Sequence, residues 1–270
     1  MNLVLRVALS ALTRPAVHRF GSDPSQVADL HLPQGSGPYP VVVLLHGGHW
    51  KAGHGKLVCR PLARDLARRG FAAWNLEYRR LGSGKGGGGG WPATFADVAA
   101  GIDALVDVAA PLDLSRVSFL GHSAGGQLAL WAAARSRLPP GAVGASPRVV
   151  PDRVVGLAPV TDLRRSGSHA ERLVGSSRDE EPGRWMQADP VQAGAPGMPV
   201  LVVHPTGDAT IPVERSRDYA LATGARLVET AGGHRDPIDP TSDAWAATIQ
   251  WLAEDLAALS PSHPPGTDPP

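Results

Sequence analysis

Short apolar runs alternate with helix-like segments along most of this chain, and this alternation constrains the fold more than any other feature of the sequence. Runs of strand length, about four to seven residues, lie at 41–45, 71–77, 117–120, 154–160, 200–204 and 225–230. Helical patterns are predicted over 61–69, 92–109, 126–135 and 244–259. Continuous apolar runs are typical of strands buried on both faces. The pattern predicts an α/β fold with a mostly parallel central sheet and helices on both faces, in one domain over 1–260.

Composition excludes several classes of function. The 26 Lys and Arg residues and 25 Asp and Glu residues leave a net charge of +1, which gives no strong field to attract nucleic acid or an anionic membrane. No run approaches the roughly 18 apolar residues that a membrane span needs. Cys59 is the single cysteine, so an internal disulfide is excluded. We expect a cytoplasmic protein that acts on a small molecule, with no nucleic-acid or membrane partner; a homodimer remains open.

Glycine and proline are unusually frequent, with 32 and 26 residues in a chain of 270, and they indicate many turns. Two segments interrupt the strand and helix pattern. The first, Gly82–Gly90, is almost entirely glycine, and the second, 261–270, is a proline-rich stretch without apolar residues. Neither can bury enough apolar surface to offset its ordering entropy. We expect a mobile loop at 82–90 and a disordered tail at 261–270.

The sequence Gly121-His-Ser123-Ala-Gly125 directly follows a predicted strand and directly precedes a predicted helix. This G-x-S-x-G pattern in that context is typical of a nucleophile elbow, a sharp turn whose flanking glycines leave room for the neighbouring strand and helix. We therefore predict that Ser123 is a nucleophile exposed at the carboxyl end of the sheet.

A serine nucleophile needs a histidine to accept its proton and a carboxylate to orient that histidine. Asp208 and His234 follow the last two predicted strands, at the edge where open α/β sheets build their sites, and the order Ser, Asp, His is that of α/β hydrolases. Asp162, Asp236 and Asp239 are alternative acids. Asp208 is favoured because it follows the strand just before the strand of the histidine.

The sequence His46-Gly-Gly-His-Trp50 follows the first strongly apolar strand. Acyl transfer places negative charge on a carbonyl oxygen, and glycines allow backbone N–H groups to approach that oxygen closely. We predict that the N–H groups of Gly48, His49 and Ala124 form an oxyanion hole. Spacing of His46, His49 and His54 fits no metal site that we recognise, so we predict neither a metal nor another cofactor.

The HGGHW sequence at 46–50 resembles the HGGxW motif of kynurenine formamidases and related esterases of the α/β-hydrolase fold, and GHSAGG at 121–126 resembles their nucleophile turn. Further similarity to bacterial members lies at 29–33, 75–80, 91–94 and 238–242. By this resemblance, Ser123, Asp208 and His234 are nucleophile, acid and base, and Gly48 and His49 belong to the oxyanion hole. His49, Pro205 and Arg235 depart from the family pattern.

Residues 161–199 occupy the place where this fold commonly inserts a cap over the active site. The segment is short and polar, so we predict a modest cap and a fairly open pocket that suits a small acyl or formyl group. Trp50 and Trp185 lie in predicted loops near the site, and we expect them to line the pocket. Four cap arginines could bind a substrate carboxylate or simply be solvated: Arg164, Arg165, Arg172 and Arg184.

These features together predict a cofactor-free serine hydrolase that cleaves a carboxylic ester or a small amide through an acyl-enzyme. Carboxylesterase activity and arylformamidase activity on N-formylkynurenine are competing forms of this prediction. The alternative is a non-catalytic α/β-hydrolase-fold protein that binds a small ligand. Such proteins typically lack a triad member or the oxyanion turn, whereas this sequence contains candidates for both.

Overall fold

The computed structural model describes residue 7 and residues 15–258. The predicted tail at 261–270 lies outside the described residues, as do the last residue of the helix predicted to end at 259 and most of the first fourteen residues.

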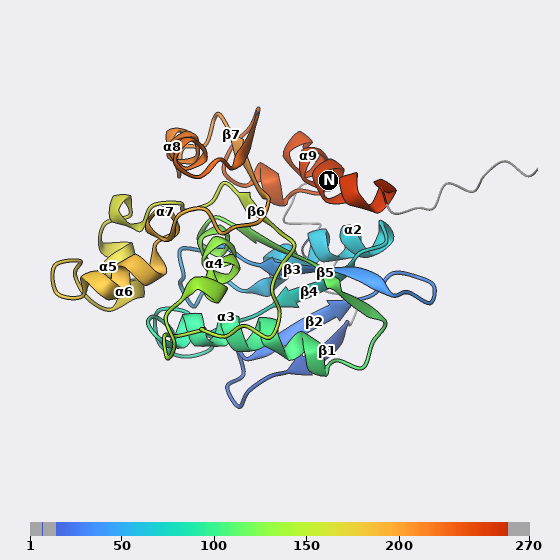
Figure 1. The fold of residues 1–270 in the computed structure, drawn as a ribbon, viewed down its shortest axis with the longest axis horizontal. Helices are drawn as coiled ribbons and strands as arrows, with labels where there is room; N and C mark the ends of the chain where they lie inside the picture. Colours follow the sequence, from blue (N-terminus) through green and yellow to red (C-terminus); the bar gives the residue numbers. More distant parts are fainter. Residues whose placement is uncertain (1–6, 8–14, 259–270) are drawn as a thin grey trace, which may run out of the picture.

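One eight-stranded sheet forms the centre of the described structure, with strand order β1-β2-β4-β3-β5-β6-β7-β8 (Figure 1). β2 pairs antiparallel with β1 and β4, and every other neighbouring pair is parallel. The predicted mostly parallel sheet is therefore present. The strands are β1 Ala16–Arg19, β2 Val27–His31, β3 Tyr39–Leu45, β4 Ala72–Leu76, β5 Leu112–His122, β6 Arg153–Leu157, β7 Val200–Pro205 and β8 Arg226–Thr230.

Helices cover both faces of the sheet. The α-helices are α2 Arg60–Arg68, α3 Ala93–Asp103, α4 Ala124–Ala133, α5 Ser168–Val174, α6 Pro182–Ala188, α7 Pro190–Ala193, α8 Glu214–Thr223 and α9 Asp243–Ala258. Short 3₁₀ helices are η1 Lys56–Cys59, η2 Ala104–Asp107, η3 Arg135–Arg137, η4 Leu163–Arg165 and η5 Asp236–Ile238. None of the described helices is long and apolar enough to cross a bilayer.

The two faces of the central strands pack into two separate cores, because successive side chains of a strand point to opposite faces. Along β3, Val41, Val43 and Leu45 join the core beneath α3 and α4, whereas Val42 and Leu44 join the core beneath α2 and α9. All five side chains are completely buried. This burial on both faces explains why the strand is a continuous apolar run in the sequence.

The cap predicted at 161–199 contains η4, α5, α6 and α7, and these helices gather on one side of the molecule beyond α4 (Figure 1). Their apolar residues, among them Leu173, Trp185 and Ala188, belong to the same core as α3 and α4. The segment therefore packs onto the body of the protein and leaves a small pocket beside the carboxyl ends of the strands.

Gly82–Gly90, which composition predicts to be a mobile loop, has a specific backbone arrangement. Its backbone folds back on itself through hydrogen bonds from Gly87 N–H to Gly84 O at 3.0 Å and from Gly88 N–H to Gly82 O at 2.9 Å. A Cβ atom at Gly89 would overlap the carbonyl of Arg79, and one at Gly87 would overlap the carbonyl of Gly82. These glycines are needed for close backbone packing, which composition alone does not distinguish from flexibility.

Candidate active site

Ser123 lies in the turn between β5 and α4, with backbone angles φ 55° and ψ −119°. A positive φ is strained for a residue with a side chain and is typical of a nucleophile elbow. The flanking glycines are required sterically: a Cβ atom at Gly121 would overlap the carbonyl of Gly125, and one at Gly125 would overlap the carbonyl of Leu45. The local sequence therefore fixes a turn that only small flanking residues can form.

Ser123, His234 and Asp208 are brought together at the carboxyl edge of the sheet. Ser123 Oγ lies 2.9 Å from His234 Nε2, and His234 Nδ1 lies 2.6 Å from Asp208 Oδ2. Burial alone would raise the pKa of Asp208, but hydrogen bonds from Ile211 N–H and from His234 outweigh it and lower this pKa. Asp208 is therefore an ionised acceptor for Nδ1–H, which leaves Nε2 free to accept the serine proton.

The loop that carries Asp208 is held by a second histidine that the sequence interpretation did not identify. Asp208 Oδ1 accepts hydrogen bonds from Thr210 N–H at 2.7 Å and Ile211 N–H at 2.9 Å. His204, at the end of β7, is completely buried. Its Nε2 lies 2.9 Å from Ile211 O, and its Nδ1 lies 2.7 Å from Ser216 Oγ. In the sequence, the sign of this role is that a polar residue, His204, ends the apolar run 200–204.

A third buried histidine supports the loop of His234. His122 Nε2–H donates to the carbonyl oxygen of His234 at 2.8 Å, and the two rings lie 4.8 Å apart. Burial lowers the pKa of His122 to about 3. The ring is therefore neutral near pH 7 and acts as a structural donor behind the catalytic histidine candidate.

The three alternative acids have other partners. Asp162 pairs with Arg164 at 2.8 Å, and Asp236 Oδ2 accepts the N–H of Gly233 at 2.7 Å, which shapes the loop before His234. Asp239 accepts hydrogen bonds from Thr241. Among the candidates, Asp208 is the carboxylate within hydrogen-bond distance of the His234 ring.

The predicted oxyanion residues lie in the turn after β3 and at the start of α4. Ala124 is the first residue of α4, where backbone N–H groups have no acceptor within the helix. Gly48 has φ 119° and His49 has φ 55°, in a turn that directly follows β3. His49, Ser123 and Ala124 line one common pocket. The two turns therefore bring two of the predicted donors, His49 and Ala124, to the pocket that Ser123 lines.

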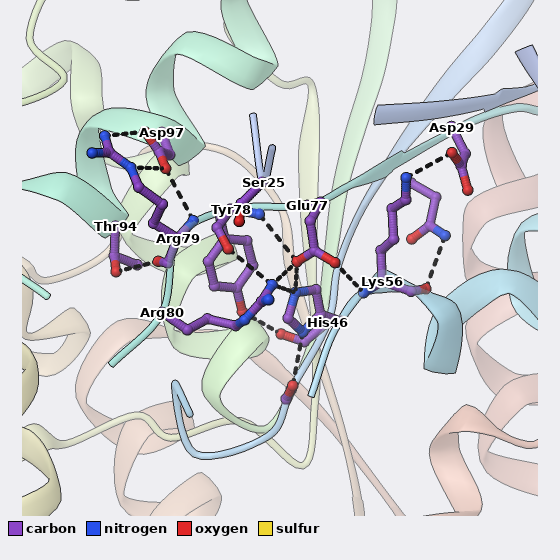
Figure 2. A network of polar contacts seen from close by, with 12 residues as sticks. Ser25, Asp29, His46, Lys56, Glu77, Tyr78, Arg79, Arg80, Thr94 and Asp97 are labelled. Atoms are coloured by element: carbon purple, nitrogen blue, oxygen red, sulfur yellow. Dashed lines mark hydrogen bonds and ion pairs between the residues drawn. The ribbon is translucent and has the colours of Figure 1, made fainter. Parts of the chain in front are cut away.

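A buried polar network supports the turn that begins at His46 (Figure 2). The ring of His46 lies 2.8 Å from Gly47 O and 2.8 Å from Glu77 Oε1. Tyr78 donates its hydroxyl to His46 O at 2.6 Å, and its ring stacks on the His46 ring at 4.4 Å. Glu77 also pairs with Arg80 and accepts the N–H of Lys56. The resemblance at 75–80 predicts no role for these side chains.

The pocket beside Ser123 has a volume of about 220 Å³. Its lining comes from the oxyanion turn, the nucleophile turn, the start of the cap and the segment after β7: His49, Trp50, Ser123, Ala124, Val160, Arg165, Ser166, His169, Thr210, Ile211 and Arg215. Trp50 contributes to this lining as predicted, although it is 2% exposed, and its indole N–H donates to Gln127 at 3.1 Å.

The prediction that Trp185 lines the pocket is wrong. Trp185 lies on α6, is 4% exposed and packs in the core beneath the cap. Its indole N–H donates to the carbonyl of Ser176 at 3.1 Å, so the polar atom is satisfied within the cap. A large aromatic residue in a short polar segment served here to anchor that segment.

Of the four cap arginines, Arg165 lines the pocket. Arg164 pairs with Asp162, and Arg184 pairs with Glu181. His169 and Arg215 also line the pocket, although no motif in the sequence marked them.

The three histidines of the HGGHW region, His46, His49 and His54, were not predicted to bind a metal. In the described part of the chain, no three His, Cys, Asp or Glu side chains are arranged to hold a metal ion. His46 is engaged by Gly47 and Glu77, and His49 instead lies near His169, with ring centroids 5.8 Å apart.

Comparisons with known proteins agree with this architecture. The BD-FAE family model matches residues 28–222. Esterase LipC of Mycobacterium tuberculosis is 28% identical over 234 residues, covering 76% of this chain. The chain spans about half of the length of that relative, 55%.

Solved structures with the same fold include a truncated carbohydrate esterase from gut microbiota, with a TM-score of 0.74, 21% identity, and coverage of 91% of this chain and 98% of that one. The esterase Est2 of Thermogutta terrifontis has a TM-score of 0.72, 23% identity, and coverage of 95% and 96%. Esterase B of Lactobacillus rhamnosis has a TM-score of 0.72, 19% identity, and coverage of 94% and 91%. These similarities confirm the predicted α/β-hydrolase fold. Because the family model covers most of the chain, the protein belongs to the BD-FAE family, an esterase family of the α/β-hydrolase fold.

Proposed function

We propose that this protein is a serine hydrolase that cleaves carboxylic esters through an acyl-enzyme, with Ser123 as nucleophile, His234 as base and Asp208 as the acid that orients it. The observation that carries the proposal is the continuous hydrogen-bond chain from Ser123 Oγ through the His234 ring to Asp208, with distances of 2.9 and 2.6 Å. Nucleophile and base within such reach, and the base held by a third group, are the features of an activated serine.

In the first half of the reaction, Ser123 Oγ attacks the ester carbonyl while His234 Nε2 accepts its proton. Asp208 stabilises the imidazolium that forms and keeps its Nδ1–H in place. The N–H groups of Gly48, His49 and Ala124 bind the negative oxygen of the tetrahedral intermediate, which is expected to lower the barrier by several kcal/mol, about 3 for one donor. His234 then donates the proton to the leaving alcohol oxygen, and the ester C–O bond breaks.

In the second half, water attacks the acyl-enzyme. His234 accepts a proton from that water, the same N–H groups stabilise the second tetrahedral intermediate, and the proton returns to Ser123 Oγ as the carboxylic acid leaves. No step needs an oxidant, a reductant or a cofactor.

The size of the pocket supports a short acyl group. Its volume of about 220 Å³ is below the range of about 300–1,000 Å³ common for drug-sized ligands, and buried Trp50 forms one wall. The names of the similar proteins, esterases in each case, agree with an ester substrate. A formyl amide would also fit by size, so N-formylkynurenine belongs in the first substrate panel as the competing amide.

The direct test compares the wild-type protein with Ser123→Ala on p-nitrophenyl acetate and N-formylkynurenine. Ser118→Ala is a matched control, because Ser118 lies on the same strand, β5, five residues before the nucleophile. We expect the Ser123→Ala variant to lose at least about 10³-fold in kcat and the Ser118→Ala variant to retain the wild-type rate. An unchanged rate in Ser123→Ala would refute the proposed nucleophile.

The two substrates in this panel also rank the competing activities. A higher kcat/KM for p-nitrophenyl acetate, after correction for its uncatalysed hydrolysis, supports an esterase. A higher value for N-formylkynurenine would assign an arylformamidase to the same residues.

A fluorophosphonate probe distinguishes an enzyme from a protein that only binds a ligand in this pocket. Stoichiometric labelling that is absent in Ser123→Ala and present in Ser118→Ala is expected for an activated serine. A folded wild-type protein that neither hydrolyses the panel nor reacts with the probe would favour the non-catalytic alternative.

A further inference from the structure

The charged side chains that line the pocket beside Ser123 are all basic. Arg165 comes from η4 in the cap, and Arg215 comes from α8. Both line the pocket together with His49 and His169, and no aspartate or glutamate is among the described lining residues. Burial, and then the nearby His169, lower the pKa of His49, so the permanent positive charge of the pocket comes from the two arginines.

These two arginines differ in how their charge is balanced. Arg165 pairs with Asp218 at 2.7 Å. Arg215 makes no ion pair with a described carboxylate: its Nη2 donates to the carbonyl oxygen of Arg165 at 2.8 Å, and its buried Nε has no hydrogen-bond partner among the described residues. Arg217, two residues further along the same helix, shows the usual arrangement, with ion pairs to Glu214 and Glu229.

An incompletely balanced guanidinium of this kind is unfavourable in the free protein. Burial lowers the pKa of Arg215, the positive charge of Arg165 lowers it further, and Asp162 partly opposes the shift. A half-buried cation without an ion-pair partner among the described carboxylates gains strongly from an anion that enters the pocket. Carboxylates suit arginine best, because two oxygens can accept from two parallel N–H groups.

We propose that the preferred esters of this protein carry a carboxylate group, and that Arg215 binds this group in the pocket beside Ser123. The inference rests on the proposed hydrolase function and narrows its substrate class. The chain has a net charge of only +1, so the field of its whole surface contributes little to the selection of an anionic substrate. Selection would instead come from the positive charge of the arginines in the pocket.

The test uses two pairs of esters that differ in charge and little in shape. The first pair, 3-acetoxybenzoate and 3-acetoxybenzamide, carries the difference on the alcohol side of the scissile bond. The second pair, monomethyl glutarate and methyl 5-amino-5-oxopentanoate, carries it on the acyl side. Rates of the full-length protein are measured by pH-stat titration, which follows the acid released from every ester.

For the wild-type protein, kcat/KM should be higher for the carboxylate member of at least one pair. Arg215→Gln should lower kcat/KM for that member by about 10- to 100-fold, the loss expected for a charged hydrogen bond, and change the neutral member by less than about threefold. Arg215→Lys should restore part of the preference. Arg217→Gln is the matched control and should leave both members unchanged, because that side chain lies at the surface.

The possible outcomes separate this inference from the proposed function. Hydrolysis that depends on Ser123, with no charge preference in either pair or with equal losses for both members in Arg215→Gln, would overturn the carboxylate inference and leave the hydrolase intact. If no ester in the panel is hydrolysed by the folded wild-type protein, the proposed ester hydrolysis fails and this inference fails with it. Thermal unfolding of each variant verifies that the losses do not arise from unfolding.

Discussion

Replacing Tyr78 with phenylalanine tests whether the buried network behind the oxyanion turn supports that turn. Tyr78 and His46 are both completely buried, and the tyrosine hydroxyl donates to His46 O at 2.6 Å. Phenylalanine keeps the ring and therefore the stacking on His46, but it leaves a buried carbonyl without its donor. Removing one partner of a buried hydrogen bond typically costs about 1–3 kcal/mol, and this loss in the free energy of unfolding is expected for Tyr78→Phe.

The same substitution should reduce catalysis more than binding. His46 O belongs to the peptide that leads into Gly47 and Gly48, so loss of its donor lets the turn move and misaligns the proposed oxyanion N–H groups. Complete removal of one oxyanion donor costs about 10²- to 10³-fold in kcat. We expect a smaller loss, about 10-fold, because the donors are displaced and not removed. KM should change little, because these N–H groups act on the transition state.

Urea unfolding, followed by tryptophan fluorescence, measures the stability change, and steady-state kinetics with p-nitrophenyl acetate separate kcat from KM. Tyr39→Phe is the matched control, since the Tyr39 hydroxyl is buried but has no hydrogen-bond partner among the described residues. Its removal should be neutral or stabilising. The reasoning is refuted if Tyr78→Phe costs no more stability than Tyr39→Phe, or if it raises KM and leaves kcat unchanged.

Three further predictions concern the rest of the structure. Gly89→Ala should lose about 3 kcal/mol or more in urea unfolding, because its Cβ atom would overlap a backbone carbonyl, whereas Gly53→Ala, with open space around it, should be nearly neutral. Burial lowers the pKa of His122 from its ordinary 6.5 to about 3, so its contribution to stability falls as pH drops below 6.5, by about 2 kcal/mol at pH 5, or 1.5 pH units at about 1.4 kcal/mol each; His122→Gln should remove this part of the pH dependence of urea unfolding. Burial raises the pKa of Cys59 to about 12, so the native protein should resist iodoacetamide at pH 8, and modification as fast as in urea-unfolded protein would contradict the structure.

The sequence predicted the parts of the fold whose side chains are buried on both faces. Each of the six predicted strands lies at least partly within β3 to β8. β1 and β2 were not predicted as strands because they are short and only partly apolar; β1 has a mainly exposed pattern, and β2 contains a buried Asp29 that pairs with Lys56 and Arg60. Helix α8 was not predicted because it has no apolar stripe: its buried residues are Ser216 and Tyr219.

Site residues were predictable where local geometry demands particular residue types. The elbow around Ser123 needs its glycines, and Asp208 and His234 follow strands whose carboxyl ends meet at one edge. The side chains that surround the pocket follow no such local rule: Arg215 on α8 and His169 on α5 line the same pocket although they are far apart in the sequence. Trp185 illustrates the converse error, because an aromatic residue in a polar segment can anchor the core as readily as it can face a substrate.

The glycine run at 82–90 packs against the oxyanion turn. Leu81 N–H donates to Trp50 O at 2.7 Å, and Ala52 N–H donates to Leu81 O at 2.9 Å, which ties the start of the run to the HGGHW turn. A Cβ atom at Gly86 would overlap the guanidinium of Arg80, and Arg80 pairs with Glu77, the carboxylate that contacts His46. The backbone of the run thus packs against a buried charge that helps to hold His46. A side chain at Gly86 would therefore press on Arg80, the partner of Glu77. Five other positions of the run need glycine for different reasons: Gly82, Gly84, Gly88 and Gly90 have positive φ, and Gly89 packs against the carbonyl of Arg79.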